Sequence, residues 1–380
     1  MLGAGGASSR KRFFRPAPAA SRREPTPEAS TAPAATAAGE PRSILFLRID
    51  RIGDMVLSLP ALRALKARFP RARLAVLASP SNQALLRHEP YIDEVLVLRS
   101  GRRRLPHLLA LLPRLRRRRF SLVLDPLPEE DPAALILALL CGAGRTMGFG
   151  GGIRSRLYDT VLPPPPPGRH FCDLTCDLIR SFGGFADPGL PRWVPGGEER
   201  DFARRWFADQ GITGSEVIGI HPGGSYPSQR WPLRHHAALI RMLEAGALGR
   251  VLLLGGEAEA PLTAEIQRQC GRRDLPAFIS RDLRQAAAVI ARCRLLIANN
   301  SGPLHLAAAL GVPTVSTRGP TRSGRWTPLG GPHRVLEREG LSCLGCEKGV
   351  CPRGTHDCLV GISPAEVFAA VEDLWRATRT

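Results

Sequence analysis

Short apolar runs alternate with amphipathic stretches along most of the chain. In the first half, four runs have the length and composition of buried strands: residues 43–49 (SILFLRI), 72–78 (ARLAVLA), 94–98 (EVLVL) and 121–127 (SLVLDPL). Helical periodicity separates them at residues 61–69 and 107–119, and the first of these stretches places Leu62, Leu65 and Phe69 on one face. This alternation predicts βαβ units and a parallel sheet covered by helices.

The same plan begins again after a loop-rich passage that contains Pro163–Pro167. Four more strand candidates, each ending in a Gly-rich or polar loop, are VIGIHPGG (217–224), VLLLGGEAE (251–259), LLIANNSG (295–302) and VPTVSTRGP (312–320). The sequence therefore predicts an α/β protein with two doubly wound domains joined near residues 190–215. We expect a basic Ala/Pro-rich disordered arm at 1–41, an N-terminal domain at 42–190 and a C-terminal domain at 191–360. A closing helix at 361–380 is expected to pack back on the N-terminal domain.

Glycine-rich turns mark the expected ligand site. In open α/β sheets, ligands bind beyond the carboxyl ends of the strands, where backbone N–H groups and helix N-termini face an anion. The second half has three such turns, HPGGSYPSQRWP, LGGEAEA and NNSGPLHLAAALGVP, whereas the first half has one, RIGDMV. This asymmetry predicts that the C-terminal domain holds a phosphorylated ligand and that the N-terminal domain presents a reacting group to it.

Composition narrows the class of protein. The chain has 380 residues, 43% of them hydrophobic, and a net charge of +19 that comes almost entirely from arginine, since its only lysines are Lys11, Lys66 and Lys348. The charge favours a polyanionic partner, and an arginine-rich coding bias is the alternative explanation. No apolar run reaches the ~20 residues that span a bilayer. Nine cysteines, an odd number, fit a reducing compartment. We expect a cytoplasmic protein, soluble or peripheral.

The motifs resemble those of glycosyltransferase family nine, the ADP-heptose lipopolysaccharide heptosyltransferases. The markers occur in order from residue 43 to the closing helix: RIGDMVLSLPAL, IGIHPGGSYPSQRWP, LLLGGEAEA, ANNSGPLHLAAALGVPTVSTRGPT and GRWTPLG. The resemblance implies a GT-B architecture, in which two Rossmann-like domains face a central cleft. It also implies an inverting, metal-independent transfer of a heptose or related sugar from an ADP-sugar to a phosphorylated glycolipid at the membrane.

Asp54 is the residue on which the catalytic hypothesis depends. An aspartate after glycine at a helix start is commonly an N-terminal cap, which contributes ~1 kcal/mol. In the family, the aspartate of this motif is the general base that takes the acceptor proton, although a helix N-terminus stabilises the carboxylate and so weakens it as a base. Asp50 is expected to belong to the strand end or to support Arg51.

The donor-binding residues follow from the resemblance. Gly223, Gly224 and Ser225 are expected at the diphosphate, with Arg230 in the family's lysine position as the cation that offsets charge on the leaving ADP. The alternative for Arg230 is a surface cation beside packed Trp231. Further donor contacts are expected from one acidic residue, either Glu259 or Glu257, and from Asn300, Ser301, Gly302 and His305. Asn300 departs from the family's aspartate, and His305 has the alternative of a core histidine.

Two other features carry separate hypotheses. Cys343, Cys346, Cys351 and Cys358 form a candidate structural zinc site, and buried reduced thiols are the alternative. The stretch from Arg99 to Arg119 contains nine arginines and no acid. It is either a solvated face or a surface that meets anionic lipid.

The sequence leaves one other function class open and argues against two more. Because Asn300 replaces the family's aspartate, the alternative that the protein binds a nucleotide sugar without catalysing transfer stays open. Charge alone suggests a nucleic-acid binder, but no basic platform carries interleaved aromatic residues, so no nucleic-acid partner is expected. A dinucleotide-dependent dehydrogenase would have a G-x-G-x-x-G turn after its first strand, which the chain lacks.

Overall fold

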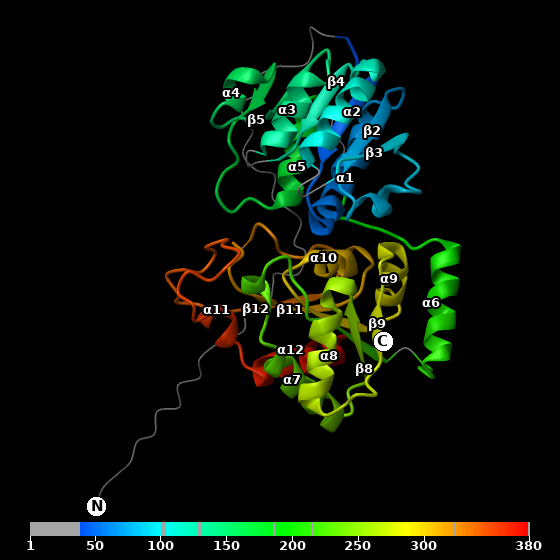
Figure 1. Ribbon diagram of the computed structural model, residues 1–380, viewed down its shortest axis with the longest axis vertical. Coiled ribbons are helices and arrows are strands. Elements are labelled where there is room, and N and C mark those ends of the chain that lie inside the picture. Colours follow the sequence, from blue (N-terminus) through cyan, green and yellow to red (C-terminus); the bar gives the residue numbers. More distant parts are fainter. Residues whose placement is uncertain are drawn as a thin grey trace, which may run out of the picture.

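The computed structural model describes residues 39–99, 104–127, 131–184, 187–214, 216–322 and 324–378. It contains two six-stranded parallel sheets, each with helices on both faces, stacked one above the other in Figure 1. Most of the expected arm, and part of the arginine-rich stretch, lie outside the described residues. Within them, no helix is long and apolar enough to cross a membrane.

The N-terminal sheet has the strand order β3-β2-β1-β4-β5-β6. Its strands are β1 (Ser43–Arg48), β2 (Arg73–Ala78), β3 (Glu94–Val97), β4 (Leu122–Asp125), β5 (Thr146–Phe149) and β6 (Thr160–Leu162). Its helices are α1 (Ile52–Arg68), α2 (Arg104–Arg118), α3 (Pro132–Leu140), α4 (Arg154–Leu157) and α5 (Phe171–Arg180), with a 3₁₀ turn, η1 (Gln83–Leu86). Apolar residues of α1 and α5 fill one face of this sheet, and those of α2 and α3 fill the other.

The C-terminal sheet repeats this topology, with the order β12-β11-β10-β7-β8-β9. Its strands are β7 (Val217–His221), β8 (Arg250–Gly255), β9 (Ala277–Ile279), β10 (Leu295–Asn299), β11 (Thr314–Arg318) and β12 (His333–Glu337). Its helices are α6 (Gly197–Asp209), α7 (Leu233–Ala245), α8 (Ala260–Cys270), α9 (Leu283–Ile290), α10 (Gly302–Ala309), α11 (Asp357–Val360) and α12 (Pro364–Ala377), with 3₁₀ turns η3 (Pro227–Gln229) and η4 (Glu257–Glu259).

The predicted α/β class and parallel pairing are confirmed, and all eight predicted strands are present. Four strands were not predicted: β5, β6, β9 and β12. The last two of these have three and five residues, and much of β12 is only half-buried, so its sequence HRVLE carries no continuous apolar signal. In both sheets the order reverses beside the first strand, at β1/β4 and at β7/β10, which is where ligands bind in this topology.

The closing helix corrects one prediction. α12 packs against α7, β11 and β12 of the C-terminal domain, not on the N-terminal domain. Its buried residues Val367, Ala370, Val371 and Leu374 follow helical spacing and belong to the core that α7 shares. The helix therefore belongs to the C-terminal domain.

The two domains meet through α1 and α10, which lie at their junction in Figure 1. Two glycines permit this approach. A Cβ atom at Gly53 would lie 2.8 Å from His305 Cδ2, and one at Gly302 would lie 2.9 Å from Ile52 Cβ. Aromatic contact adds to the junction, because Phe171 of α5 stacks on Trp326 with 4.5 Å between ring centroids.

Candidate active site

The N-termini of α1 and α10 open onto the same interdomain cleft. Each helix end presents backbone N–H groups and a partial positive charge, so their convergence favours an anion between the domains. The larger cavity of this cleft has a volume of about 820 Å³ and is lined by Arg51 and Ile52 from one domain and by Ser301 and Gly302 from the other. The predicted meeting of the RIGDMV and NNSG turns is therefore present in the structure.

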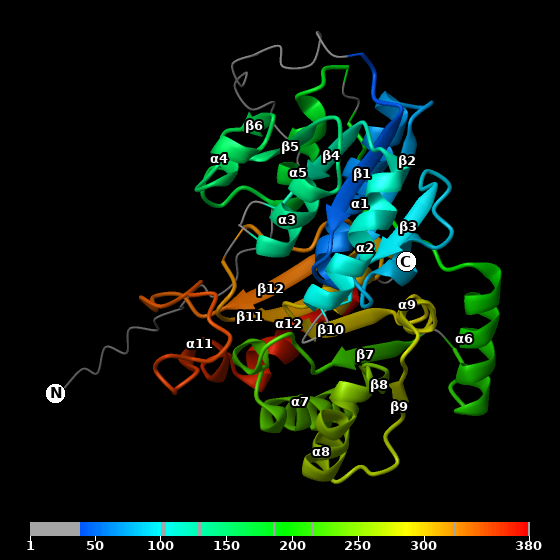
Figure 2. The same ribbon diagram turned by 45° about the horizontal axis from the view of Figure 1, so that its top comes forward.

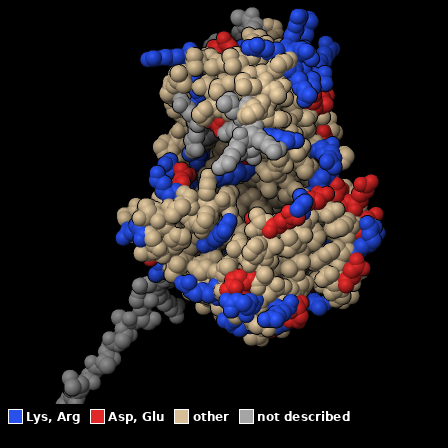
Figure 3. Space-filling model, in the orientation of Figure 1, with Lys and Arg blue, Asp and Glu red and all other residues tan. Residues whose placement is uncertain are grey.

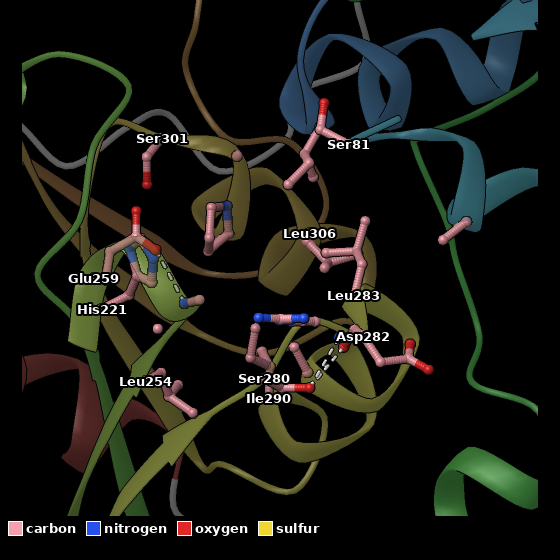
Figure 4. Close-up of a pocket in the computed structure, with 18 of the residues that line it drawn as sticks. Ser81, His221, Leu254, Glu259, Ser280, Asp282, Leu283, Ile290, Ser301 and Leu306 are labelled. Atoms are coloured by element: carbon pink, nitrogen blue, oxygen red, sulfur yellow. Dashed lines mark hydrogen bonds between the residues drawn. The ribbon is translucent and has the colours of Figure 1, made fainter. Parts of the chain in front are cut away.

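One side of this cavity carries a polar pair, a buried histidine and a half-buried glutamate. His221, the last residue of β7, lies beside Glu259, and Ser301 lies above them, while Ser81 enters from the N-terminal domain (Figure 4). Burial lowers the pKa of His221 to about 4, so the imidazole is neutral near pH 7. Gly223 leaves room for this pair, because a Cβ there would lie 2.7 Å from both Glu259 Cγ and His221 Cε1.

The structure distinguishes the two acidic candidates. Glu259 lines the cavity and accepts a hydrogen bond from Gly256 N at 3.0 Å, which fixes its carboxylate at the end of β8. Glu257 also lines the cavity, but it forms an ion pair with Arg281 and its side chain is 54% exposed. Glu259 is therefore the better-positioned partner for a bound molecule.

The opposite wall of the same cavity is largely apolar. Ile290 and Leu306 contribute to it, and Figure 4 shows Leu283 close to Leu306 across the pocket from Glu259, whereas Leu254 lies on the same side as His221. A flat apolar group flanked by a polyol would match this combination of an apolar wall and a carboxylate.

A second pocket of about 240 Å³ contains Asp54. Five of its lining residues carry a buried polar atom without a hydrogen-bond partner among the described residues: Gln229 Oε1, Asn300 Nδ2, Ser301 Oγ, His305 Nδ1 and Thr321 Oγ1. Unpaired buried polar atoms are costly, and native proteins satisfy nearly all of them with protein groups, water or ligand. Their concentration in one small pocket indicates a site for a molecule with several hydroxyl groups.

Asp54 is both a cap and a strong candidate base. Its Oδ2 accepts a hydrogen bond from Arg51 N at 3.0 Å, so the capping function is real. Burial, reinforced by the nearby Asp50 carboxylate, nevertheless raises the pKa of Asp54 to about 7, against the opposing effects of Arg48 and of the Arg51 N–H. Desolvation outweighs the helix terminus, so Asp54 can exchange a proton near neutral pH.

Asp50 has its partner at the end of β1. Its Oδ2 accepts a hydrogen bond from Arg48 Nη1 at 2.7 Å, and the Arg48 side chain is fully buried with its guanidinium 4.7 Å from the centroid of Phe171. Of its two expected roles, Asp50 therefore has the one at the strand end, and it does not support Arg51. Arg51 instead reaches across the cleft, where it stacks on Tyr226 and donates a hydrogen bond to the Tyr226 hydroxyl at 2.6 Å.

The structure separates Arg230 from its neighbour Gln229. Arg230 Nε and Nη2 donate to Gly224 O at 3.3 and 3.2 Å, and Arg230 lines neither pocket, whereas Gln229 lines the smaller one. The guanidinium therefore supports the Gly223–Gly224 turn without lining either pocket. Both glycines of that turn are buried, and Gly224 and Ser225 line the larger cavity.

Asn299 and Asn300, at the end of β10, have different contacts. Asn299 donates to the carbonyl oxygens of Pro222 and Gly223 and accepts from Trp231 N, which ties the HPGG turn to β10. Asn300 lines the small pocket together with Ser301, Gly302 and His305. Burial lowers the pKa of His305 to about 3, so it offers a neutral ring rather than a charge.

The four clustered cysteines lie beside the smaller pocket. Their segment contacts the donor-side loop, because Ser228 Oγ donates to Lys348 O at 2.6 Å, and Glu347 lines the pocket. All four thiols are half-buried, whereas the other five cysteines are buried. In the described part of the chain, no group of three or more His, Cys, Asp and Glu side chains is arranged to hold a metal ion. Structural zinc at these four cysteines therefore stays a prediction.

Sequence reasoning missed four functional candidates: Arg51, His221, Tyr226 and Gln229. His221 and Gln229 stand inside the HPGGSYPSQRWP motif, so a polar side chain at a strand end was an available signal. The contact between Arg51 and Tyr226 joins residues 175 positions apart, and no local pattern predicts it.

Comparisons with known proteins find one family model and several relatives that match most of the chain. The sequence model of Glycosyltransferase family 9 (heptosyltransferase) matches residues 108–355. Lipopolysaccharide heptosyltransferase 2 of Salmonella typhimurium is 30% identical over 357 residues, which cover 87% of this chain and 98% of that protein. The Escherichia coli protein of the same name is 29% identical over 356 residues, with the same coverage.

A solved structure supports the fold. The structure of E. coli ADP-heptose lps heptosyltransferase II aligns with a TM-score of 0.69 at 24% identity, over 88% of this chain and 99% of that one. The GT-B architecture expected from the resemblance is confirmed, as two parallel-sheet domains facing a cleft.

Proposed function

The chain belongs to glycosyltransferase family 9, the heptosyltransferase family, and from this premise we propose that it transfers a heptose or related sugar from an ADP-sugar to a lipopolysaccharide-type, lipid-linked acceptor. The observation that carries the proposal is the smaller pocket, in which a buried carboxylate of raised pKa meets several unpaired polar atoms.

The two pockets suggest how the donor binds. In this proposal the adenine lies against the apolar wall of the larger cavity, and Glu259 accepts hydrogen bonds from the ribose hydroxyls. The diphosphate meets the N–H groups of the Gly223–Gly224 turn, of Ser225 and of the Ser301–Gly302 helix start. The sugar enters the smaller pocket, where its hydroxyls satisfy Asn300, Gln229 and His305.

The transfer step uses Asp54 as the base. The acceptor oxygen attacks the anomeric carbon from the face opposite the diphosphate while Asp54 takes the hydroxyl proton. The bond from the anomeric carbon to the phosphate oxygen breaks, ADP leaves with the electron pair, and the anomeric configuration inverts. Helix N-termini and Arg230, acting through the Gly224 turn, offset the charge that develops on ADP, so the proposal requires no catalytic metal.

The proposal is tested with ADP-heptose and a heptose-acceptor glycolipid, with and without EDTA. We expect an acceptor that gains one heptose by mass spectrometry, an inverted anomeric configuration by NMR, and no loss of rate with EDTA. Binding of the donor without turnover on any acceptor would favour the noncatalytic binding protein that the Asn300 substitution leaves open.

We separately propose that the cysteine segment, residues 343–358, binds a structural zinc ion in solution. The C-x2-C spacing of Cys343 and Cys346 supports it, and Cys351 and Cys358 of the same segment are the other candidate ligands. We expect about one zinc per chain by elemental analysis and a lower Tm after chelation. Cys343→Ser with Cys346→Ser should remove the metal, and Cys270→Ala, outside the cluster, should retain it. Metal-free wild-type protein of unchanged Tm would leave only reduced thiols.

We also propose that the protein works in the cytoplasm, at the membrane surface that holds its acceptor. Every Lys, Arg, Asp or Glu residue in the described part of the stretch that ends at Arg119 is an arginine, and several of these side chains are exposed. Anionic lipid is the partner that this charge favours.

A further inference from the structure

Exposed large apolar side chains are concentrated on one face of the N-terminal domain. Of the ten described residues of this kind, seven fall between positions 109 and 161: Leu109, Ile136, Leu139, Leu140, Ile153, Leu157 and Val161. The three others, Val194, Tyr226 and Val350, lie elsewhere in the chain. Single exposed apolar residues are normal on a protein surface, but a group on adjacent elements indicates an interaction site.

Five of the seven residues lie on α2, α3 and α4, and the two others, Ile153 and Val161, lie directly before α4 and in β6 after it. Buried residues of α2 and α3, together with Tyr158 at the end of α4, form one core on the same side of the N-terminal sheet. The outward sides of these helices therefore belong to one surface, which we call the α2–α4 face. α2, α3 and α4 lie across the front of the upper domain in Figures 1 and 2.

α3 shows most clearly that this face is not an ordinary solvated surface. Its sequence is PAALILALL, and its outward residues Ile136, Leu139 and Leu140 follow the i, i+3, i+4 spacing of one helical stripe. A surface helix usually places charged residues on its outer side. α8 and α12 of the C-terminal domain follow that rule, with exposed ion pairs between Glu265 and Arg268 and between Glu372 and Arg376.

The charge on α2, α3 and α4 themselves has a single sign, although Asp159, just after α4, is exposed. None of the three helices contains Asp or Glu, whereas Arg114, Arg117 and Arg156 are exposed on them. Arg116 joins α2 to α3, because its Nε donates to Leu140 O at 2.7 Å beside the exposed Leu140 side chain. In Figure 3, Lys and Arg flank the uncharged surface of the upper domain, while most of the visible Asp and Glu lie on the lower domain.

We propose that the α2–α4 face docks on an anionic phospholipid surface, with its leucine and isoleucine side chains in the headgroup layer and its arginines on the lipid phosphates. Apolar side chains and arginines on one helical surface are the combination that interfacial binding requires. A second copy of the chain fits less well, because a symmetric contact would bring arginines against arginines. This inference rests on the proposed function, because a lipid-linked acceptor would be the reason for the protein to bind a membrane.

The test is co-sedimentation of the full-length protein with vesicles that contain no glycolipid, so that it does not depend on the proposed reaction. Vesicles of phosphatidylcholine with phosphatidylglycerol should bind the protein, and vesicles of phosphatidylcholine alone should bind it weakly. Leu140→Glu with Ile153→Glu should weaken binding by about tenfold or more. The matched control, Val194→Glu with Val350→Glu, adds the same charge at more exposed apolar positions and should bind like the wild type.

A second pair of variants tests the charge without touching apolar packing. Arg114→Gln with Arg117→Gln should weaken binding by about tenfold at low salt, and Arg268→Gln with Arg376→Gln on the other domain should change it by less than about twofold. Equal losses in the test and control variants, or no loss in either, would overturn the proposal. So would a glutamate variant that dissociates an oligomer in analytical ultracentrifugation while its vesicle binding is unchanged.

Discussion

Asp54→Asn should lower kcat by about 10²- to 10⁴-fold while the dissociation constant for ADP and the Tm stay close to wild type. Asparagine keeps the shape of the side chain and an oxygen that can accept the Arg51 N–H, so the cap of α1 is retained. What is lost is the group that takes the acceptor proton. Single-turnover rates, ADP titration and thermal melting of the same preparation measure the three quantities.

The pH dependence follows from the raised pKa of about 7 on Asp54. Only the ionised carboxylate accepts a proton, so kcat/KM should rise with pH toward about 7 and level off above it. The linked effect on stability has the opposite direction. The folded state holds this proton more tightly than the unfolded state, so the group's contribution to the free energy of unfolding falls as pH rises from about 4 to about 7. Asp54→Asn should remove both trends.

The contrasting variant is Arg230→Ala, which should weaken ADP affinity and turnover together, because the Gly224 turn loses its support and the diphosphate loses a nearby charge. A near wild-type rate for Asp54→Asn, or a lower Tm with no loss of kcat, would mean that Asp54 is only a helix cap.

Gly302→Ala should lower kcat/KM by about 100-fold in a protein that remains folded. The added methyl group would lie 2.9 Å from Ile52 Cβ and 3.3 Å from Gly53 N, so α1 and α10 must move apart by a few tenths of an ångström. Asp54 then shifts relative to the donor groups of the other domain. Steady-state kinetics and ADP titration measure the loss, and the Tm shows whether either domain unfolds.

The matched control is Gly197→Ala in the first turn of α6. No heavy atom lies within 4 Å of a Cβ built there, and the substitution is chemically the same. It should leave kcat/KM unchanged. If Gly302→Ala also retains wild-type kcat/KM, then the close approach of the two helix starts has no bearing on turnover.

The sequence by itself determined the architecture. Strands with continuous apolar runs alternate with amphipathic helices, and that pattern specifies parallel sheets because each strand is buried on both faces. It also located the cleft, since Gly-rich turns at strand ends lie on the same edge of such sheets. Asp54, Glu259, Asn300, Ser301 and His305 were all expected at the cleft, and the structure brings them to it.

Only the tertiary structure decided between adjacent residues and placed the last helix. Gln229 and Arg230 stand side by side in one loop, but the carbonyl of Gly224 draws Arg230 away from the pocket that Gln229 lines. Glu257 and Glu259 differ because only the first meets Arg281. The pKa of Asp54 depends on burial and on Asp50, and α12 docks where α7 leaves an apolar face open. Each outcome depends on which atoms come together in the folded protein, and local sequence patterns do not encode those contacts.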